Sequence, residues 1–211
     1  MVDTMKLKEY VIGITGASAS IYGIELIKQL QANNSIIHLL ITNAGWQVIQ
    51  TELFADNITY GMHKKLTISD KQNLLKELEI AIEENVHLHE LSDYSIGIAS
   101  GSYHFDAMVI VPCTMGTLSA LATGASDNLL ERVADIALKE NRQLIIVPRE
   151  TPLNRIHLKN MLTVLDAGAT ILPAMPAFYH QPKSFNDIAL FIVGKILDQL
   201  KIEHQLFKRW G

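Results

Sequence analysis

The amino-acid sequence predicts a single α/β domain built around a central parallel sheet. Short β-branched strand patterns alternate with helical patterns along the chain, and several strands run directly into a helix start. A length of 211 residues fits one large domain, and 48% hydrophobic with 19% charged residues describes a core-rich chain. The apolar excess also suggests oligomerisation, although a sheet buried on both faces could absorb much of it.

The first half of the chain contains two predicted strand–helix pairs and an irregular segment. We expect strands at 10–15 and 36–42, each followed by a helix, at 19–32 and 44–53. Residues 55–105 are the least regular part of the chain. There, 71–84 is expected to be helical, with turns or short extended pieces at 57–60 and 95–102.

The second half repeats the alternation more clearly. Asn128 with Glu131 indicates a capping box, and Thr151 followed by Pro152 indicates a helix start. We expect a strand at 107–111, helices at 116–123 and 128–140, a strand at 143–147, a helix at 153–166, a strand at 169–172, a proline-bearing loop at 173–182 and a final helix at 184–200. Residues 1–9 are interpreted as an N-terminal extension of the single domain, and about 201–211 as a C-terminal tail.

Charge, cysteine content and hydropathy exclude several classes of protein. A net charge of −4 without a basic stripe argues against a nucleic-acid surface. The single cysteine, Cys113, rules out an intrachain disulfide and fits a reducing compartment. The N-terminus lacks an apolar signal core, and no apolar run approaches the ~18 residues that span a bilayer. We therefore expect a soluble, cytoplasmic protein without membrane contact.

Three strand ends are expected to form one ligand crevice, because ligands of parallel α/β sheets bind at the carboxyl ends of the strands. At Gly16-Ala17-Ser18 the glycine permits a tight turn, and the helix behind it offers N–H groups to a phosphate. The full Gly-x-Gly-x-x-Gly spacing is missing, so the loop suits a mononucleotide such as FMN better than a dinucleotide. An ordinary strand-to-helix turn is the alternative.

The other two strand ends carry hydroxyls and charges. Thr114 and Thr117 flank Gly116 and can bind a phosphate or the polar edge of a flavin, while Cys113 is expected to be a buried, inert thiol. Arg149 and Glu150 suit a phosphate and a proton transfer; the alternative is a surface ion pair beside a helix cap.

Three further features are open to two interpretations. Arg132 and Lys139 lie two turns apart on one helix face. They are either phosphate ligands or part of a solvated face. His87 and His89 would share a face if extended, but no further metal ligands cluster nearby, and we expect no metal site. The Tyr179–His180 pair lies in the proline-bearing loop, either at a site or in loop packing.

Six ordered motifs resemble the UbiX-type flavin prenyltransferases, long labelled aromatic-acid decarboxylases. They are Gly-Ala-Ser at 16–18 with Ile-Tyr-Gly at 21–23, Pro-Cys-Thr-Met-Gly-Thr-Leu at 112–118, Ser-Asp-Asn-Leu-Leu at 126–130, Pro-Arg-Glu-Thr-Pro-Leu at 148–153, Pro-Ala-Phe-Tyr-His at 176–180 and Leu-Asp-Gln-Leu at 197–200. The resemblance runs from about residue 10 to 210. It implies a flavodoxin-like (Rossmann-like) three-layer sandwich assembled as a dodecamer, with sites at subunit interfaces.

The resemblance also implies an activity. The family transfers a dimethylallyl group from dimethylallyl phosphate to reduced FMN without a metal, forming the prenylated FMN of a partner UbiD-type decarboxylase, with a link to ubiquinone biosynthesis. A flavin-dependent cysteine decarboxylase of the same fold and a non-catalytic FMN carrier are the alternatives. The sequence does not decide between monophosphate and diphosphate donors.

Site residues follow from the resemblance position by position. FMN binding is expected at Gly16, Ala17, Ser18, Thr42, Thr114, Met115, Gly116, Thr117 and Arg149, and dimethylallyl phosphate binding at Arg132, Lys139, Tyr179, Lys195 and Trp210. Glu150 is the expected base, with Ser18 and Glu52 as relay members and Lys139 as a catalytic cation; the released phosphate is the alternative base. The chain departs from the family at Ala19 (commonly glycine), Thr42 (commonly serine) and Lys195 (commonly arginine, whose bidentate fork lysine lacks).

Overall fold

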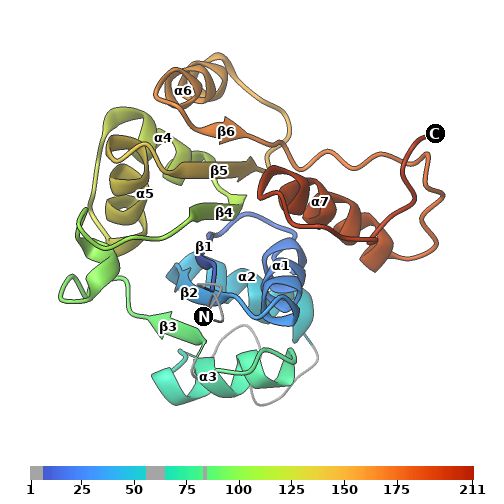
Figure 1. Ribbon diagram of the computed structural model, residues 1–211, viewed down its shortest axis with the longest axis horizontal. Helices are drawn as coiled ribbons and strands as arrows, with labels where there is room; N and C mark the ends of the chain where they lie inside the picture. The colour runs from blue at the N-terminus through green and yellow to red at the C-terminus, as the bar shows by residue number, and fades with distance from the viewer. Residues whose placement is uncertain (1–6, 56–64, 83–84) are drawn as a thin grey trace, which may run out of the picture.

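The chain folds into three layers, with a six-stranded sheet between two layers of helices (Figure 1). The computed structural model describes residues 7–55, 65–82 and 85–211. The strand order is β3-β2-β1-β4-β5-β6, and every neighbouring pair is parallel. The strands are β1 (Glu9–Ile14), β2 (Ile36–Ile41), β3 (Val86–His89), β4 (Ala107–Cys113), β5 (Gln143–Pro148) and β6 (Thr170–Ile171). The expected flavodoxin-like sandwich is confirmed.

Two apolar cores separate the layers. One face of the sheet is covered by α1 (Ile21–Ala32), α2 (Asn43–Leu53), α3 (Ile68–Glu77) and α7 (Phe185–Gln199). The other is covered by the short 3₁₀ helix η1 (Gly97–Ala99) with α4 (Met115–Thr123), α5 (Leu129–Lys139) and α6 (Arg155–Asp166). Because both faces are covered, β1 and β4 are buried at every position, which explains their continuous apolar sequences.

The order of the strands reverses at β1 and β4, and a buried hydroxyl joins the ends of these two strands. Thr15 donates from its Oγ1 to the carbonyl of Pro112 at 2.8 Å and accepts from the N–H of Thr114 at 2.8 Å. Such a reversal leaves a crevice beyond the carboxyl ends of the strands, where ligands bind. The fold therefore places the Gly16 and Thr114 loops side by side.

The structure corrects three predicted elements. Strand β3 was not expected, because its sequence Val-His-Leu-His is short and half polar. Helix α3 begins at Ile68 and ends at Glu77, since Thr67 and Asp70 cap its start reciprocally. The expected helix start at Thr151 is wrong, because the Asn154 side chain accepts from the N–H of His157 at 2.9 Å and α6 begins at Arg155.

Smaller differences concern short segments. Within 95–102 the chain forms η1, and the strand expected at 169–172 is shortened to β6. The turn expected at 57–60 lies outside the described residues. None of the helices in the described ranges is both long and apolar enough to cross a bilayer.

Candidate active site

The first wall of the site is the loop between β1 and α1, which packs against the start of α2. A Cβ atom added at Gly16 would lie 2.5 Å from the Cβ of Ala44, so only glycine allows this approach. Thr42 caps α2 through its Oγ1, which accepts from the N–H of Gly45 at 2.9 Å, and its own N–H donates to the carbonyl of Ile14 at 3.0 Å. Gly16 and Thr42 are thus brought together as expected.

Glu52 shapes the same loop from α2. Its carboxylate accepts from the N–H of Ala19 at 2.8 Å, and from the N–H and hydroxyl of Ser20 at 2.9 and 2.8 Å. Burial raises the pKa of Glu52, but the hydrogen bonds from Ser18, Ala19 and Ser20 outweigh it and lower that pKa below its ordinary value. The donors at the start of α1, expected to face a phosphate, are therefore occupied by a carboxylate of the protein itself.

This loop also explains one departure from the family pattern. Ala19 has a φ of 74°, in the left-handed region where a Cβ atom is unfavourable. The glycine that the resemblance implies at this position would adopt this conformation freely. The alanine here is held in it by the two hydrogen bonds from its N–H to Glu52.

The second wall is the start of α4. Thr114 caps this helix, because its Oγ1 accepts from the N–H of Thr117 at 3.1 Å and donates to the Thr117 hydroxyl at 3.0 Å. The first amides of a helix have no acceptor within it, so those of Met115 and Gly116 point out of the helix start. Among the described residues, a Cβ atom at Gly116 would meet only the Thr114 hydroxyl, at 3.9 Å. A flat ligand can approach the backbone here.

Cys113 does not take part in this surface. Its side chain is fully buried, and burial raises the pKa of its thiol to about 12. The expected inert thiol is confirmed.

The third wall is the end of β5. The N–H of Arg149 donates to the carbonyl of Cys113 at 3.3 Å, which joins this loop to the second wall. Burial raises the pKa of Tyr22, while Arg149 lowers it and Glu52 raises it, so both charges lie near this phenol. Glu150 is exposed, and its carboxylate accepts from the N–H of Thr151 at 3.0 Å. We call these three walls the cradle: residues 16–18, Thr42, 114–117 and Arg149.

Two aromatic residues expected at the substrate lie together. The rings of Tyr179 and Trp210 meet edge to face at 5.3 Å, and a cavity of about 290 Å³ is lined by Tyr179 and residues 208–211. The neighbouring His180 instead stacks on Phe191, with ring centroids 5.2 Å apart. Of the Tyr179–His180 pair, His180 therefore takes part in loop packing.

The three cations expected at the substrate phosphate each pair with a nearby carboxylate of the same chain. Arg132 lies 3.2 Å from Asp135, Lys139 2.5 Å from Glu140, and Lys195 3.3 Å from Asp198. Lys139 ends α5, and only three residues separate it from the start of β5, so it lies at the amino edge of the sheet, opposite the cradle. A single chain does not bring Lys139 and the cradle together.

Residues that sequence reasoning missed lie mostly in the backbone frame of the site. Ser20 was not expected there. Thr15 lies at the strand end before Gly16, and Tyr22 lies in the Ile-Tyr-Gly motif at 21–23, but the sequence indicated no role for either, nor for Asp198 in the Leu-Asp-Gln-Leu motif.

Two other polar clusters lie outside this site. A cavity of about 670 Å³ between α2 and α3 contains none of the expected site residues. Of its two lysines, Lys65 and Lys71, the second is paired with Glu90 at 2.9 Å. On β2 and β3, His38 stacks on His87 and hydrogen-bonds to His89 at 2.8 Å and Glu9 at 2.7 Å. In the described part of the chain, no three histidine, cysteine or acidic side chains are arranged to hold a metal ion.

Comparison with known proteins gives consistent matches over nearly the full length. Residues 2–197 match the Flavoprotein family. The chain is 52% identical to the flavin prenyltransferase UbiX of Halalkalibacterium halodurans, covering 96% of this chain and 93% of the relative. The crystal structure of AnUbiX in complex with FMN and dimethylallyl pyrophosphate superposes with a TM-score of 0.81 at 34% identity, covering 98% of both chains. A dodecameric FMN-dependent UbiX-like decarboxylase from Escherichia coli O157:H7 gives 0.79 at 33% identity, over 96% of this chain and 99% of that one.

Proposed function

The chain belongs to the UbiX family of flavin prenyltransferases, and we propose that it transfers a dimethylallyl group from dimethylallyl phosphate to reduced FMN. The bond between the allyl carbon and the phosphate oxygen would break and two bonds to the flavin ring would form. Each of the two ring positions would give up one proton, the allyl double bond would take up one proton, and phosphate would leave with the other. The observation that carries the proposal is the cradle at the strand reversal, in a chain 52% identical to a named flavin prenyltransferase.

The residues of the cradle fit FMN. The backbone at Gly116 is open to a flat ring, and the hydroxyls of Thr114 and Thr117 and the guanidinium of Arg149 match polar ring atoms and a phosphate. When bound, reduced FMN supplies an electron-rich ring that accepts the allyl group. The chain itself positions the two reactants and handles a proton and a leaving phosphate.

Glu150 is the proposed base for the ring proton. It is exposed at the third wall, and its backbone position is fixed by the strand end before it. Glu52 has a lowered pKa and stays ionised, which suits orienting the Ser18 hydroxyl rather than storing a proton. We therefore assign Glu52 and Ser18 to the relay and Glu150 to proton removal, with the released phosphate as its rival.

Cations and aromatic rings would act on the departing phosphate and the allyl group. Arg132, Lys139 and Lys195 offer three positive charges, and Tyr179 a hydroxyl, for the charge that develops on phosphate. The ring of Trp210 offers a face to the developing allyl cation.

Lys139 meets the cradle only if chains assemble, and α6 presents a surface for assembly. Val164 is its single buried residue, while Ile156, Leu158, Leu162 and Leu165 are exposed, with Ile156 at 66%. An apolar patch of this kind on a soluble chain marks an interaction site. We propose a cytoplasmic homo-oligomer, a dodecamer like the relative from E. coli, whose product serves a UbiD-type decarboxylase.

Mass spectrometry of the flavin tests the proposal. Purified protein is incubated anaerobically with reduced FMN and dimethylallyl monophosphate, and we expect the flavin to gain one dimethylallyl unit. Bound but unmodified flavin would instead support the non-catalytic carrier. Decarboxylation of a peptide ending in cysteine would support the cysteine decarboxylase.

A further inference from the structure

We propose that Asp198 and Arg209 form a clamp that positions Trp210 against Tyr179 in the substrate site. The inference rests on the proposed function, since it gives the Leu-Asp-Gln-Leu motif and the C-terminal tail a task in that reaction. Both clamp members are positioning residues: they act through Trp210 and need not touch the substrate.

Asp198 is the centre of a four-membered ion cluster. Its two carboxylate oxygens accept from Arg209 at 2.7 and 3.2 Å, from His204 at 3.2 Å and from Lys195 at 3.3 Å. The hydrogen bond from Arg209 is the main cause that lowers the pKa of Asp198 to about 2. The carboxylate is therefore charged at neutral pH, and the two-point contact with a guanidinium fixes direction as well as distance.

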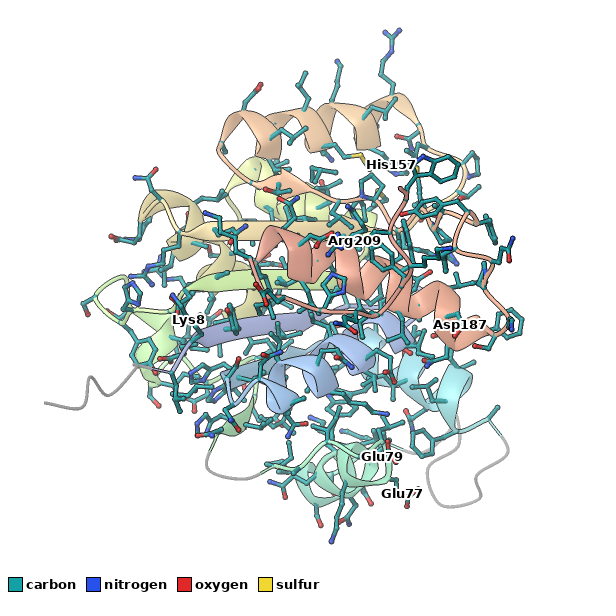
Figure 2. The ribbon with its side chains drawn as sticks, turned by 45° about the vertical axis from the view of Figure 1, so that its right-hand side comes forward. Lys8, Glu77, Glu79, His157, Asp187 and Arg209 are labelled. Atoms are coloured by element: carbon teal, nitrogen blue, oxygen red, sulfur yellow. The ribbon has the colours of Figure 1, made fainter. Side chains whose placement is uncertain are left out.

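Packing brings the tail to this carboxylate. Gly194 in α7 forms a notch, because a Cβ atom there would lie 2.5 Å from the Phe207 ring and 2.6 Å from the His204 ring. Phe207 also packs on Phe191, with ring centroids 4.8 Å apart. Arg209, labelled in Figure 2, lies two residues beyond Phe207, so its ion pair decides where the last residues go.

Trp210 has little packing of its own. It is 82% exposed, and its ring contact is the edge-to-face pair with Tyr179 at 5.3 Å. One such pair of rings is too weak to order a chain end. Arg209, the preceding residue, is held to Asp198 by two hydrogen bonds, and this contact restricts the position of Trp210.

The same carboxylate also contacts Lys195, the lysine that replaces the arginine common in the family. The two clamp residues can therefore be separated by mutation. Arg209→Gln releases the tail and leaves Lys195 paired with Asp198, whereas Asp198→Asn releases both.

The test combines kinetics with a structural readout that does not depend on activity. Trp210 mobility is followed by time-resolved fluorescence anisotropy in a Trp46→Phe background, beside kcat, KM for dimethylallyl monophosphate and FMN affinity. For Arg209→Gln we expect a mobile Trp210, unchanged FMN affinity and a roughly 10- to 100-fold loss of kcat/KM. Arg209→Lys should recover part of the loss, and Glu203→Gln, an exposed charge on the same tail, should match wild type.

A double variant makes the positioning role specific. Arg209→Gln combined with Trp210→Ala should be no slower than Trp210→Ala alone, because both changes remove one function. Additive losses, or an immobile Trp210 in Arg209→Gln, would overturn the clamp. If wild-type protein transfers no dimethylallyl group, the proposed function fails, and the anisotropy arm still decides the clamp.

Discussion

The two halves of the candidate site are built in different ways. The cradle is complete within one chain, because its loops follow directly from strand ends and are joined by Thr15, Glu52 and Arg149. The expected phosphate ligands are not: Arg132, Lys139 and Lys195 each lie against a carboxylate close by in sequence. Local backbone geometry builds the cradle, whereas we propose that Lys139 of a second chain completes the phosphate half.

The difference predicts how each half responds to damage. Changes in the cradle act on flavin binding or chemistry in the same subunit. A change at Lys139 should leave flavin binding intact and act on a neighbouring subunit.

Glu150→Gln is expected to have the largest effect. It removes the proposed base while the cradle, which would hold FMN through backbone amides, hydroxyls and Arg149, stays whole. We expect a loss of about 10²–10⁴-fold in kcat with FMN affinity unchanged. Single-turnover rates and flavin titration measure the two quantities, and wild-type rates would transfer the base role to phosphate or Glu52.

Substitutions at two glycines distinguish the space needed for FMN from the packing needed for folding. Gly116→Val places atoms in the open space of the second wall, so FMN affinity should fall about 100-fold or more while thermal stability without FMN stays near wild type. Gly16→Ala is the contrasting variant, since its Cβ atom would lie 2.5 Å from Ala44, and it should destabilise the protein itself. FMN titration and thermal unfolding of both variants are the measurements; full FMN binding by Gly116→Val would contradict the cradle.

Lys139→Ala tests the other half. One lost charge-assisted contact to phosphate should lower kcat/KM by about 10- to 150-fold, with FMN binding unchanged. Lys76→Ala, an exposed lysine at the end of α3, is the matched control. EDTA should leave the wild-type rate unaltered, because the cations rather than a metal would neutralise the phosphate; inhibition by EDTA would contradict this.

Mixed oligomers locate Lys139 directly. Gly116→Val and Lys139→Ala chains are each defective, but some sites of a hybrid assembly would combine an intact cradle with an intact Lys139 from the neighbour. We expect activity to return on mixing and reassembly. Mixtures that remain as inactive as their parents would place Lys139 and the cradle in the same subunit.

The sequence predicted what is local and missed what is not. The strands β1, β2, β4 and β5 were predicted because both faces of the sheet are buried and the strands read as apolar runs. Strand β3 was not predicted, because His87 and His89 stack with His38 across the sheet and no local sequence pattern reveals that contact. Thr151 and Asn154 are both residue types that cap helix starts, and the structure shows that Asn154 caps α6.

In the candidate site, too, local features were predicted and contacts between distant residues were not. The walls of the cradle were predicted from strand-to-helix turns, but the occupation of the α1 start by Glu52 depends on a residue 33 positions away. The pairing of Lys195 and Arg209 on one carboxylate likewise appears only once the tail folds back on α7.

Ala19→Gly is expected to have the smallest effect and to act on the cradle alone. At a φ of 74° the alanine is strained by about 1 kcal/mol, which glycine relieves, although glycine also adds entropy to the unfolded chain. The net gain should therefore be at most about 1 kcal/mol, a rise of a few degrees at most in the unfolding temperature. Because the N–H of residue 19 still donates to Glu52, kcat/KM for dimethylallyl monophosphate should not change. In a Glu52→Gln background the loop is no longer held in place, so the same substitution should give a smaller gain. Thermal unfolding of the two single variants and the double variant forms the cycle. Equal gains in both backgrounds would show that Glu52 does not impose the conformation of Ala19.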